Sequence, residues 1–452
     1  MKIAILGFGL EGKSLLKFLQ KSPQFKKADI SILDKKFDKN YLKNLERFDI
    51  VFRSPGVPYN LPEIQKAIRN GTKFSSGTKL FFEEVVRRGS PQVIGITGTK
   101  GKGTTSTLLY KILKAAGKDA YLAGNIGKPA IEILPKLKNN SIVILELSSF
   151  QLWDFHPHTK RESALLAQKN NYSRYGVGVN HSPDITVVLD IFPDHLDSHK
   201  NFSEYLNAKT NIAKWQRKTD KIFYFSDNKY SKLVAQKSPA KKIAVNSEHS
   251  NKFANLDYIL KIPGRHNLKN AIMATTVASS LGCPKNKIIT TVKNFHGNEH
   301  RLELIRTIHL HSGCVIKFYN DSASTNPQTA AAAIRAFPNQ PKILIAGGKD
   351  KNLDYSPLAQ ALKNSDTKLI ILFGENKKKI KYQVSSIKCQ IKLVKDLKSA
   401  VQLAYKTAKS LIAKPYNLNP IIIFSPASAS FDMFRDYKER GKKFKEIVKK
   451  LK

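Results

Sequence analysis

The sequence predicts an α/β protein of three domains, each built on a largely parallel sheet. Short apolar runs rich in β-branched residues alternate with longer amphipathic segments, the pattern of parallel strands connected by helices. Two glycine-rich loops each follow one of these runs, as expected where a strand turns into a helix. A chain of 452 residues is also too long for one ordinary core and fits three domains.

The predicted strands form three series along the chain. They lie at residues 2–6, 30–33 and 50–52, then at 93–96, 142–145 and 185–189, and finally at 342–345, 368–372, 391–394 and 420–424. Amphipathic helices are expected between them, among others at residues 12–20, 61–70, 106–116 and 202–214. Each series restarts after a break, which places the three domains at residues 1–91, 92–298 and 299–452.

The composition indicates a soluble, cytoplasmic protein. Hydrophobic residues make up 41% of the chain and charged residues 25%, and no apolar stretch reaches the roughly 20 residues that cross a bilayer. Three cysteines without close spacing, Cys283, Cys314 and Cys389, favour neither a disulfide framework nor a zinc site. We expect a monomer without a membrane span.

The formal net charge of +42 raises nucleic-acid binding as one alternative. The basic residues are nevertheless spread along the chain, and the densest clusters, at residues 377–381 and 441–452, alternate with apolar residues at helical spacing. This spacing is typical of solvated helix faces. Because no set of base-stacking aromatic residues is evident, we do not expect specific nucleic-acid binding. Attraction of polyanionic substrates and a general lysine preference both remain as explanations of the charge.

The first glycine-rich loop reads GFGLEG at residues 7–12, and Asp34 ends the second predicted strand. Glycines at this spacing allow a tight turn and let a diphosphate approach the start of a helix. By itself the loop would favour an NAD-dependent dehydrogenase, or merely a tightened turn. The second loop argues against the dehydrogenase, because it is a separate nucleotide-binding feature.

The second loop lies at residues 95–105, between an apolar strand and a helix. Its backbone N–H groups can surround phosphates, and Lys102 can neutralise their charge. The glycine spacing is shorter than in the general P-loop pattern, and Gly103 stands where a hydroxyl residue is usual. We therefore expect Thr104 or Thr105 to supply the hydroxyl group for magnesium.

The motifs downstream resemble the Mur ligase and folylpolyglutamate synthase superfamily. In order along the chain they are TGTKGKGTT at 97–105, GNIG at 124–127, ELSSFQL at 146–152, PDHLD at 193–197, PGRHNLKN at 263–270, GNEHRLE at 297–303, NDSASTNP at 320–327, GGKDK at 347–351 and SPASASFDMFRDY at 425–437. The similarity spans essentially the whole chain. ELSSFQL and the last motif look most like the members that add D-glutamate.

The resemblance implies an ATP-dependent ligase of peptidoglycan synthesis. It implies that the carboxylate of UDP-N-acetylmuramoyl-L-alanine is activated as an acyl phosphate and then joined to D-glutamate. The fold implied is a Rossmann-like domain for the uridine-linked substrate, a central ATPase domain of the P-loop type and a Rossmann-like last domain for glutamate. A folylpolyglutamate-type ligase is an alternative, but it should lack the first glycine-rich loop and the last motif.

The residues that this resemblance implies for ATP and substrates are numerous. For ATP they are Gly98, Thr99, Lys100, Gly101, Lys102, Gly103, Thr104, Thr105, Asn267, Arg301 and Asp321. For the uridine-linked substrate and D-glutamate they are Gly9, Leu10, Asp34, Lys35, Ser54, Asn125, Ser148, Gln151, Thr325, Lys351, Ser430 and Tyr437.

Besides Thr104, the implied metal site has three residues of different chemistry. Glu146 follows a predicted strand, at the sheet edge where a carboxylate can hold Mg²⁺. His195 taken alone favours a structural role, because Mg²⁺ prefers oxygen, but the family implies a metal contact. Lys209 matches a lysine that relatives carry as a carbamate; an unmodified lysine paired with phosphate is the alternative. The resemblance implies two Mg²⁺ ions on Thr104, Glu146, His195 and Lys209, with catalytic roles for Lys102, Glu146, His195, Lys209 and Arg301.

Two features depart from the family pattern. Residues 158–180 look inserted, and we expect a solvent loop more readily than a substrate flap there. Asp190 and Phe192 stand where relatives more often have asparagine and a small residue, which puts the local detail of the metal site in doubt.

Overall fold

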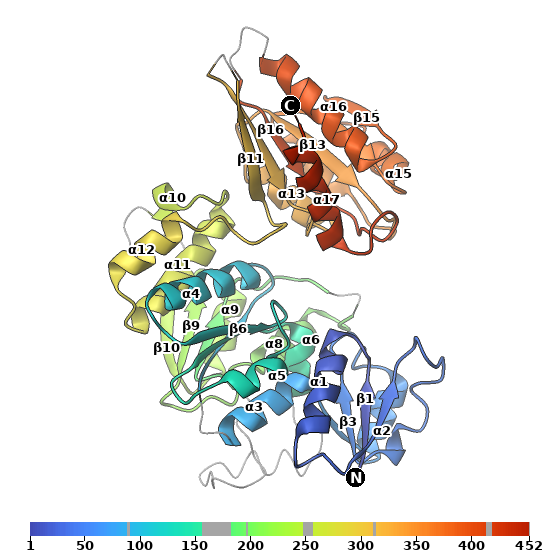
Figure 1. Cartoon of the computed structure of the whole chain (residues 1–452), viewed down its shortest axis with the longest axis vertical. Helices are drawn as coiled ribbons and strands as arrows, with labels where there is room; N and C mark the ends of the chain where they lie inside the picture. The colour runs from blue at the N-terminus through green and yellow to red at the C-terminus, as the bar shows by residue number, and fades with distance from the viewer. Residues whose placement is uncertain are drawn as a thin grey trace. The chain divides into compact units, whose positions relative to one another are not determined.

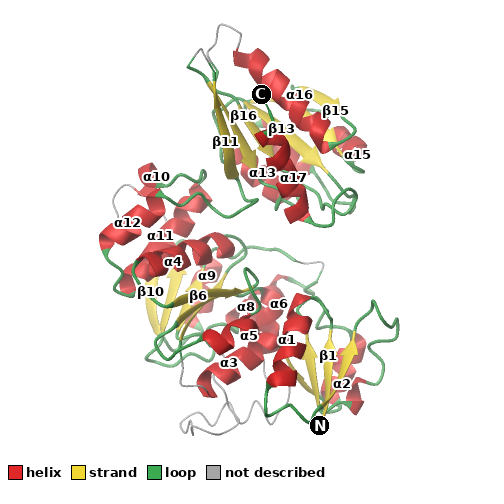
Figure 2. Ribbon diagram, viewed as in Figure 1, coloured by secondary structure: helices red, strands yellow, loops and turns green. Residues whose placement is uncertain are grey.

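The computed structural model describes residues 1–87, 91–155, 182–195, 198–246, 256–310, 313–412 and 418–451. Strands and helices alternate along the chain (Figure 2), and this confirms the predicted α/β class. Contacts divide the chain into two compact units, one of residues 1–256 with 269–292 and the other of residues 257–268 with 293–452. The predicted boundaries near residues 91 and 299 stay a prediction.

The first sheet is parallel and has the order β2-β1-β3-β4. Its strands are β1 (Lys2–Leu6), β2 (Asp29–Leu33), β3 (Ile50–Arg53) and β4 (Lys73–Ser75). The helices of this region, drawn in blue in Figure 1, are α1 (Leu10–Lys21), α2 (Pro62–Arg69) and α3 (Gly77–Arg87). Four consecutive apolar residues of β1, residues 3–6, are fully buried, as expected for a central strand covered on both faces.

The second sheet is also parallel, with the order β10-β9-β8-β5-β7-β6. Its strands are β5 (Gln92–Thr97), β6 (Ala120–Gly124), β7 (Ile142–Glu146), β8 (Ile185–Val188), β9 (Lys221–Phe225) and β10 (Lys241–Val245). The helices along this part of the chain are α4 (Lys102–Ala115), α5 (Ala130–Ile133), α6 (Ser149–Leu152), α8 (Phe202–Thr210), α9 (Lys229–Gln236), α10 (Leu256–Ile259), α11 (Arg265–Ser280) and α12 (Lys285–Lys293). Because β5 lies between β7 and β8, the strand order reverses at β5. Ligands of open α/β folds bind at such a reversal point.

The third sheet has the order β11-β12-β16-β13-β14-β15, and only the β11–β12 pair is antiparallel. Its strands are β11 (Glu303–His309), β12 (Val315–Asn320), β13 (Lys342–Gly347), β14 (Thr367–Phe373), β15 (Gln390–Leu393) and β16 (Ile421–Phe424). Its helices are α13 (Pro327–Arg335), α14 (Ser356–Lys363), α15 (Lys377–Gln383), α16 (Leu397–Ile412) and α17 (Tyr437–Lys449). Two separate apolar clusters pack against this sheet.

Two helices differ from their predicted bounds by four residues at one end. The helix expected at 106–116 begins four residues earlier, at Lys102, because Gly101 has a left-handed backbone and leads the chain straight into it. The helix expected at 202–214 ends at Thr210, and Asn211 Nδ2 then donates to Leu152 O at 3.1 Å. The earlier start of α4 places Lys102 and Thr104 in its first turn.

Candidate functional site

Two glycines shape the loop that connects β5 to α4. Gly98 has φ +151° and Gly101 has φ +85°, which are backbone conformations that favour glycine. A Cβ atom added to Gly98 would lie 2.7 Å from Leu189 Cβ, and one added to Gly101 would lie 2.1 Å from Asn270 Oδ1. The loop therefore needs glycine at both positions, and it leads into a helix N-terminus whose N–H groups and dipole favour an anion.

Two lysine side chains converge on one carbonyl group of this loop. Lys102 Nζ donates to Gly98 O at 3.0 Å and to Thr99 O at 3.1 Å, while Lys209 Nζ donates to Gly98 O at 2.9 Å. Lys209 is 1% exposed, and its burial, together with the nearby Lys102, lowers its pKa well below the usual range. The fold thus brings two predicted site residues to the predicted phosphate loop.

Tyr205 belongs to the same cluster and was not among the predicted residues. Its hydroxyl oxygen lies 2.9 Å from Thr99 Oγ1, and its ring centroid lies 4.6 Å from Lys209 Nζ. Burial raises the pKa of Tyr205 well above its usual range. The signal that could have found it is spacing, because Tyr205 precedes Lys209 by four residues and shares its face of α8.

Glu146 ends β7 and is held by Asn125. Asn125 Nδ2 donates to Glu146 Oε1 at 2.8 Å, and Asn125 N donates to Glu146 O at 2.9 Å. Gly124 has φ +100° and permits this approach, since a Cβ atom there would lie 2.4 Å from Glu146 O. A predicted substrate residue and a predicted metal ligand are therefore joined at the carboxyl edge of the second sheet.

His195 follows β8 in a backbone conformation with φ 55°. Its ring centroid lies 5.1 Å from that of Phe150 and 6.2 Å from that of Tyr205, so it lies beside the phosphate-loop cluster. Its own backbone N–H donates to Asp194 Oδ1 at 3.0 Å. The last two residues of the PDHLD motif, at positions 196–197, lie outside the described residues.

The residues predicted to hold Mg²⁺ offer few oxygen atoms of their own. Within the described ranges, no group of three or more His, Cys, Asp or Glu side chains could hold a metal ion. The Glu146 carboxylate and the Thr104 hydroxyl remain as donors, and Thr105 Oγ1 is buried with no hydrogen-bond partner in the part of the chain that the structure describes. This set fits Mg²⁺, which commonly keeps several waters and binds phosphate oxygens beside one or two carboxylates.

The first glycine-rich loop meets two other predicted residues at the carboxyl edge of the first sheet. Phe8 N donates to Asp34 Oδ2 at 2.6 Å, and Ser54 Oγ donates to Gly7 O at 2.6 Å. Hydrogen bonds from the backbone N–H groups of Lys36 and Phe8 lower the pKa of Asp34. The chain around 7–12 is thus tied to the ends of β2 and β3. Gly9, Leu10 and Lys35 lie exposed nearby.

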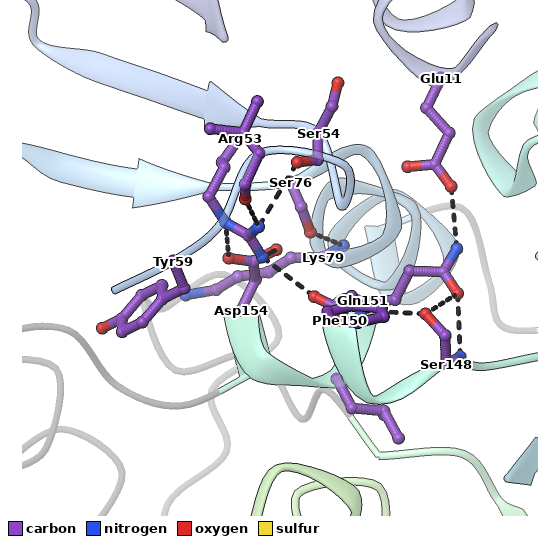
Figure 3. A network of polar contacts seen from close by, with 12 residues as sticks. Glu11, Arg53, Ser54, Tyr59, Ser76, Lys79, Ser148, Phe150, Gln151 and Asp154 are labelled. Atoms are coloured by element: carbon purple, nitrogen blue, oxygen red, sulfur yellow. Dashed lines mark hydrogen bonds and ion pairs between the residues drawn. The ribbon is translucent and has the colours of Figure 1, made fainter. Parts of the chain in front are cut away.

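Gln151 links the first glycine-rich loop to the second sheet, as Figure 3 shows. Its Nε2 donates to Glu11 Oε1 at 2.8 Å, and its Oε1 accepts from Ser148 N at 3.0 Å within the capping box of α6. Burial raises the pKa of Glu11 to about 7. Two predicted substrate residues, Ser148 and Gln151, therefore have fixed positions.

Arg53 makes a second link between the two sheets and was also not predicted. Its Nη2 lies 2.8 Å from Asp154 Oδ2 and donates to Phe150 O at 2.9 Å (Figure 3). Both charged side chains are almost fully buried, at 1% and 0% exposure. Beside this pair is a cavity of about 320 Å³, lined by Arg53, Pro55, Gly56, Pro58, Tyr59, Asn60, Asn125, Ser148, Phe150, Trp153, Ser198 and His199. Two predicted substrate residues, Asn125 and Ser148, therefore line the same cavity.

In the second unit, Asp321 follows β12 and is buried. Ser425 Oγ donates to Asp321 Oδ2 at 2.7 Å, and Leu302 N donates to its Oδ1 at 3.2 Å. Burial raises the pKa of Asp321 to about 7. Arg301 is exposed next to Leu302, and Asn267 Nδ2 donates to Pro263 O at 2.6 Å.

The predicted glutamate residues lie on loops of the same unit. Lys351 Nζ lies 5.7 Å from the ring centroid of Phe431, the residue after the buried Ser430. Tyr437 O accepts from Ser322 Oγ at 2.8 Å. The structure thus brings the Lys351 and Ser430 loops together, whereas Thr325 lies in a separate loop that enters α13.

Comparison with known proteins shows the family of this chain. Residues 96–278 match the Mur ligase middle domain, and residues 300–412 match the glutamate ligase domain of Mur ligases. The UDP-N-acetylmuramoylalanine–D-glutamate ligase of Acetivibrio thermocellus is 33% identical over 495 aligned positions, which cover 100% of this chain and 96% of that protein. A protein of the same name from Clostridium botulinum is 32% identical, with coverage of 100% and 97%. This chain belongs to the Mur ligase family.

Solved structures of other Mur ligases share the fold of this Mur ligase. UDP-N-acetylmuramate–alanine ligase from Thermotoga maritima has a TM-score of 0.55 at 17% identity, with 100% of both chains covered. A MurF ligase from the same organism, solved in complex with ADP, has a TM-score of 0.55 at 15% identity, with 99% of this chain and 95% of that chain covered. At these identities the likeness concerns the fold alone.

Asp190 and Phe192, which depart from the pattern of the family to which this Mur ligase belongs, both accept hydrogen bonds from Thr99. Lys269 Nζ lies 2.8 Å from Asp190 Oδ2, and Asp190 O accepts from Thr99 N at 2.8 Å. Phe192 O accepts from Thr99 Oγ1 at 3.0 Å. Both residues therefore support the loop between β5 and α4. The insertion expected at 158–180 lies outside the described residues.

No helix in the described ranges is both long and apolar enough to span a bilayer.

Proposed function

We propose that this Mur ligase joins D-glutamate to UDP-N-acetylmuramoyl-L-alanine, with conversion of ATP to ADP and phosphate. The observation that carries the proposal is the full-length match to two proteins named for this reaction, which share 32–33% of their residues with this chain. The phosphate loop with its two lysines supports the use of ATP. The enzyme acts as a monomer in the cytoplasm.

The first step activates the alanyl carboxylate. A carboxylate oxygen attacks the γ-phosphorus of ATP, the bond from that phosphorus to the bridging oxygen breaks, and ADP leaves behind an acyl phosphate. In this proposal the N–H groups of the loop and the Lys102 ammonium group offset the negative charge on the phosphates, and the bond of Lys102 Nζ to Gly98 O supports its place at the loop. Glu146, His195, Thr104 and Lys209 would hold Mg²⁺, which supplies further charge neutralisation at the phosphate oxygens.

The second step forms the amide bond. The neutral amine of D-glutamate attacks the acyl carbon, and the tetrahedral intermediate expels phosphate and gives up an amine proton. Lys351, Ser430, Thr325 and the backbone of Tyr437 bind the amino acid in this proposal, and Arg301, Asn267 and Asp321 bind ATP. In the first unit, Asp34, Lys35 and Ser54 bind the uridine diphosphate, and Asn125, Ser148 and Gln151 bind the sugar and alanyl parts.

We further propose that the side-chain amine of Lys209 is carbamylated. Its amine nitrogen bonds to the carbon of CO₂ and loses a proton, which turns a cation into a carboxylate-like ligand. Its burial and lowered pKa support a neutral, nucleophilic amine. A carbamate signal from carbon-13 bicarbonate, present in the wild type and absent in Lys209→Arg, is expected. Without that signal in the wild type, Lys209 is an amine that pairs with phosphate.

The assay is phosphate release from ATP with UDP-N-acetylmuramoyl-L-alanine, comparing D-glutamate, L-glutamate, L-lysine and no amino acid, with the product mass confirmed. Stimulation by D-glutamate alone is the expected result. Stimulation by another amino acid instead would retain the ligase chemistry and overturn the proposed substrate. No release that depends on the uridine-linked substrate would overturn the proposal.

We expect Lys102→Ala to reduce this activity by at least ~100-fold, because a cation that faces the transferring phosphoryl group is removed. Lys114, exposed in the last turn of the same helix, gives the matched control Lys114→Ala. Both variants should unfold at the wild-type temperature. Full activity of the folded Lys102→Ala variant would refute the phosphate role of Lys102.

A further inference from the structure

Asn376 stands immediately before α15 but does not cap that helix. Asparagine at this position usually accepts from the N–H groups of the first turn, and here no such side-chain bond forms. Its Oδ1 instead accepts from Gly348 N at 2.9 Å, and its Nδ2 donates to Tyr355 Oη at 2.6 Å and to Ser428 Oγ at 2.7 Å. The side chain is 2% exposed, so these bonds are made away from solvent.

Asn376 and its partners belong to the loops that follow three different strands. Gly348 follows β13, Asn376 follows β14 and Ser428 follows β16. Tyr355 Oη also lies 2.9 Å from Ser428 Oγ, which closes a ring of hydrogen bonds among three buried side chains. The backbone repeats the connection, because Asn376 N donates to Gly348 O at 3.1 Å. Asn376 therefore holds Gly348 from both its N–H and its C=O.

The same loops touch through their backbones. A Cβ atom on Gly347 would lie 1.9 Å from Phe373 O, and one on Gly348 would lie 2.2 Å from Ala429 O. Lys349 N donates to Ala429 O at 2.9 Å. With so little space between the chains, the hydrogen bonds of Asn376 set where each loop lies relative to the other two.

Two of the predicted glutamate-binding residues extend from these loops. Lys351 stands three residues after Gly348, and Ser430 stands two residues after Ser428. Lys379 of α15 holds the far end of the Lys351 loop, since its Nζ lies 3.2 Å from Asp350 Oδ1 and 2.7 Å from Asn352 Oδ1. The Lys351 loop is thus attached on both sides to the start of α15.

We propose that Asn376 is a positioning residue for the incoming amino acid, fixing with Tyr355 and Ser428 the distance between the Lys351 and Ser430 loops. This inference rests on the proposed function, in which Lys351 and Ser430 of these loops both bind D-glutamate. In this proposal Asn376 does not itself bind D-glutamate. It acts through Gly348 and Ser428, because a displacement of either loop separates the groups that must bind one small molecule together.

Steady-state kinetics of three single variants test the proposal. We expect Asn376→Ala and Tyr355→Phe each to raise the KM for D-glutamate, Asn376→Ala by about tenfold, with the KM for ATP unchanged. The effects should be less than additive in the double variant, because both changes break one ring. The matched control is Tyr405→Phe, which removes the hydroxyl of a buried tyrosine of α16, next to Phe318, and should leave the KM for D-glutamate unchanged.

A second readout needs no substrate. Hydrogen exchange of the ligand-free protein should become faster in residues 348–352 and 428–432 of Tyr355→Phe, and of Asn376→Ala if that variant folds. An unchanged KM for D-glutamate in folded Tyr355→Phe, or slow exchange retained in both segments, would overturn the positioning role. An inactive wild type would overturn the proposed function instead, and the exchange result would still decide whether Asn376 fixes the loops.

Discussion

At the residue scale, two buried lysines differ in what surrounds them. Lys209 donates to Gly98 O, whereas Lys342 at the start of β13 is fully buried, and no group in the described ranges accepts a hydrogen bond from its Nζ. Burial lowers the pKa of Lys342. A buried amine without an acceptor costs stability. Burial of a lysine is therefore no sign of a functional role by itself.

We expect Lys342→Met to raise the free energy of unfolding by ~1–2 kcal/mol at pH 7, because the unpaired amine is removed and the apolar chain is kept. Since the folded-state pKa of Lys342 is lowered, its penalty is greatest at low pH and disappears above the ordinary value of 10.5. Urea unfolding at pH 7 and pH 10 should show the gain shrinking. A less stable Lys342→Met protein at pH 7 would contradict this reading.

Glu11 gives the opposite dependence on pH. Its pKa is raised to about 7 from an ordinary 4.5, so its stabilising contribution is complete below pH 4.5 and is lost as the pH rises through 7. Glutamine cannot ionise, and the advantage of Glu11→Gln over the wild type should therefore be small at pH 4 and large at pH 8. Chemical unfolding across that range measures it. An advantage that does not change with pH would count against the buried carboxylate.

At the element scale, the Arg53–Asp154 pair connects the end of β3 to the residues after α6. Removing one member of a buried pair leaves the other charge unpaired, so Arg53→Met should lower the free energy of unfolding by ~3–5 kcal/mol. The double variant Arg53→Met/Asp154→Leu should recover most of that loss. Equilibrium unfolding compares the proteins.

Lys66→Met is the control, since its pair with Glu46, 3.5 Å apart, is exposed and should contribute at most ~1 kcal/mol. A loss in Arg53→Met no larger than in this control would show that the buried pair does not hold the two elements together.

Most predicted strands match strands of the structure, but β4, β6, β9, β10, β11 and β12 were not predicted. Strands such as β5, β7 and β13 are buried on both faces and are continuous apolar runs. β10 begins with two lysines, and β11 is only partly buried, so neither has a distinctive apolar pattern. Both were missed for that reason.

The candidate site shows the same limit. Glycine loops and strand-end carboxylates were found because their chemistry is local in the sequence. Arg53 and Asp154 are 101 positions apart, and the bonds of Asn376 join three separate loops. Such partners depend on tertiary packing, and no local sequence pattern predicts them. Tyr205 is the intermediate case, since its helical spacing to Lys209 was visible.

At the scale of the whole molecule, the chain has 77 basic residues and 35 acidic residues. Self-repulsion of this excess opposes the compact state, and salt screens it over about 10 Å at 0.1 M. We expect the unfolding temperature to rise as sodium chloride is increased from low to moderate concentration. Uncharged sorbitol at equal osmolality is the comparison. A temperature that falls or stays constant with salt would mean that the charges are already balanced locally.

The lysines at the start of β10 also affect how the protein aggregates. This strand lies at the edge of its sheet, and Lys241 and Lys242 at its start are exposed. A second molecule that paired along this edge would set like charges against each other, so the strand resists aggregation. Added salt weakens that protection while it favours the fold. Concentrated stocks should therefore stay clear longest in dilute buffer, even though the individual molecules are less stable there.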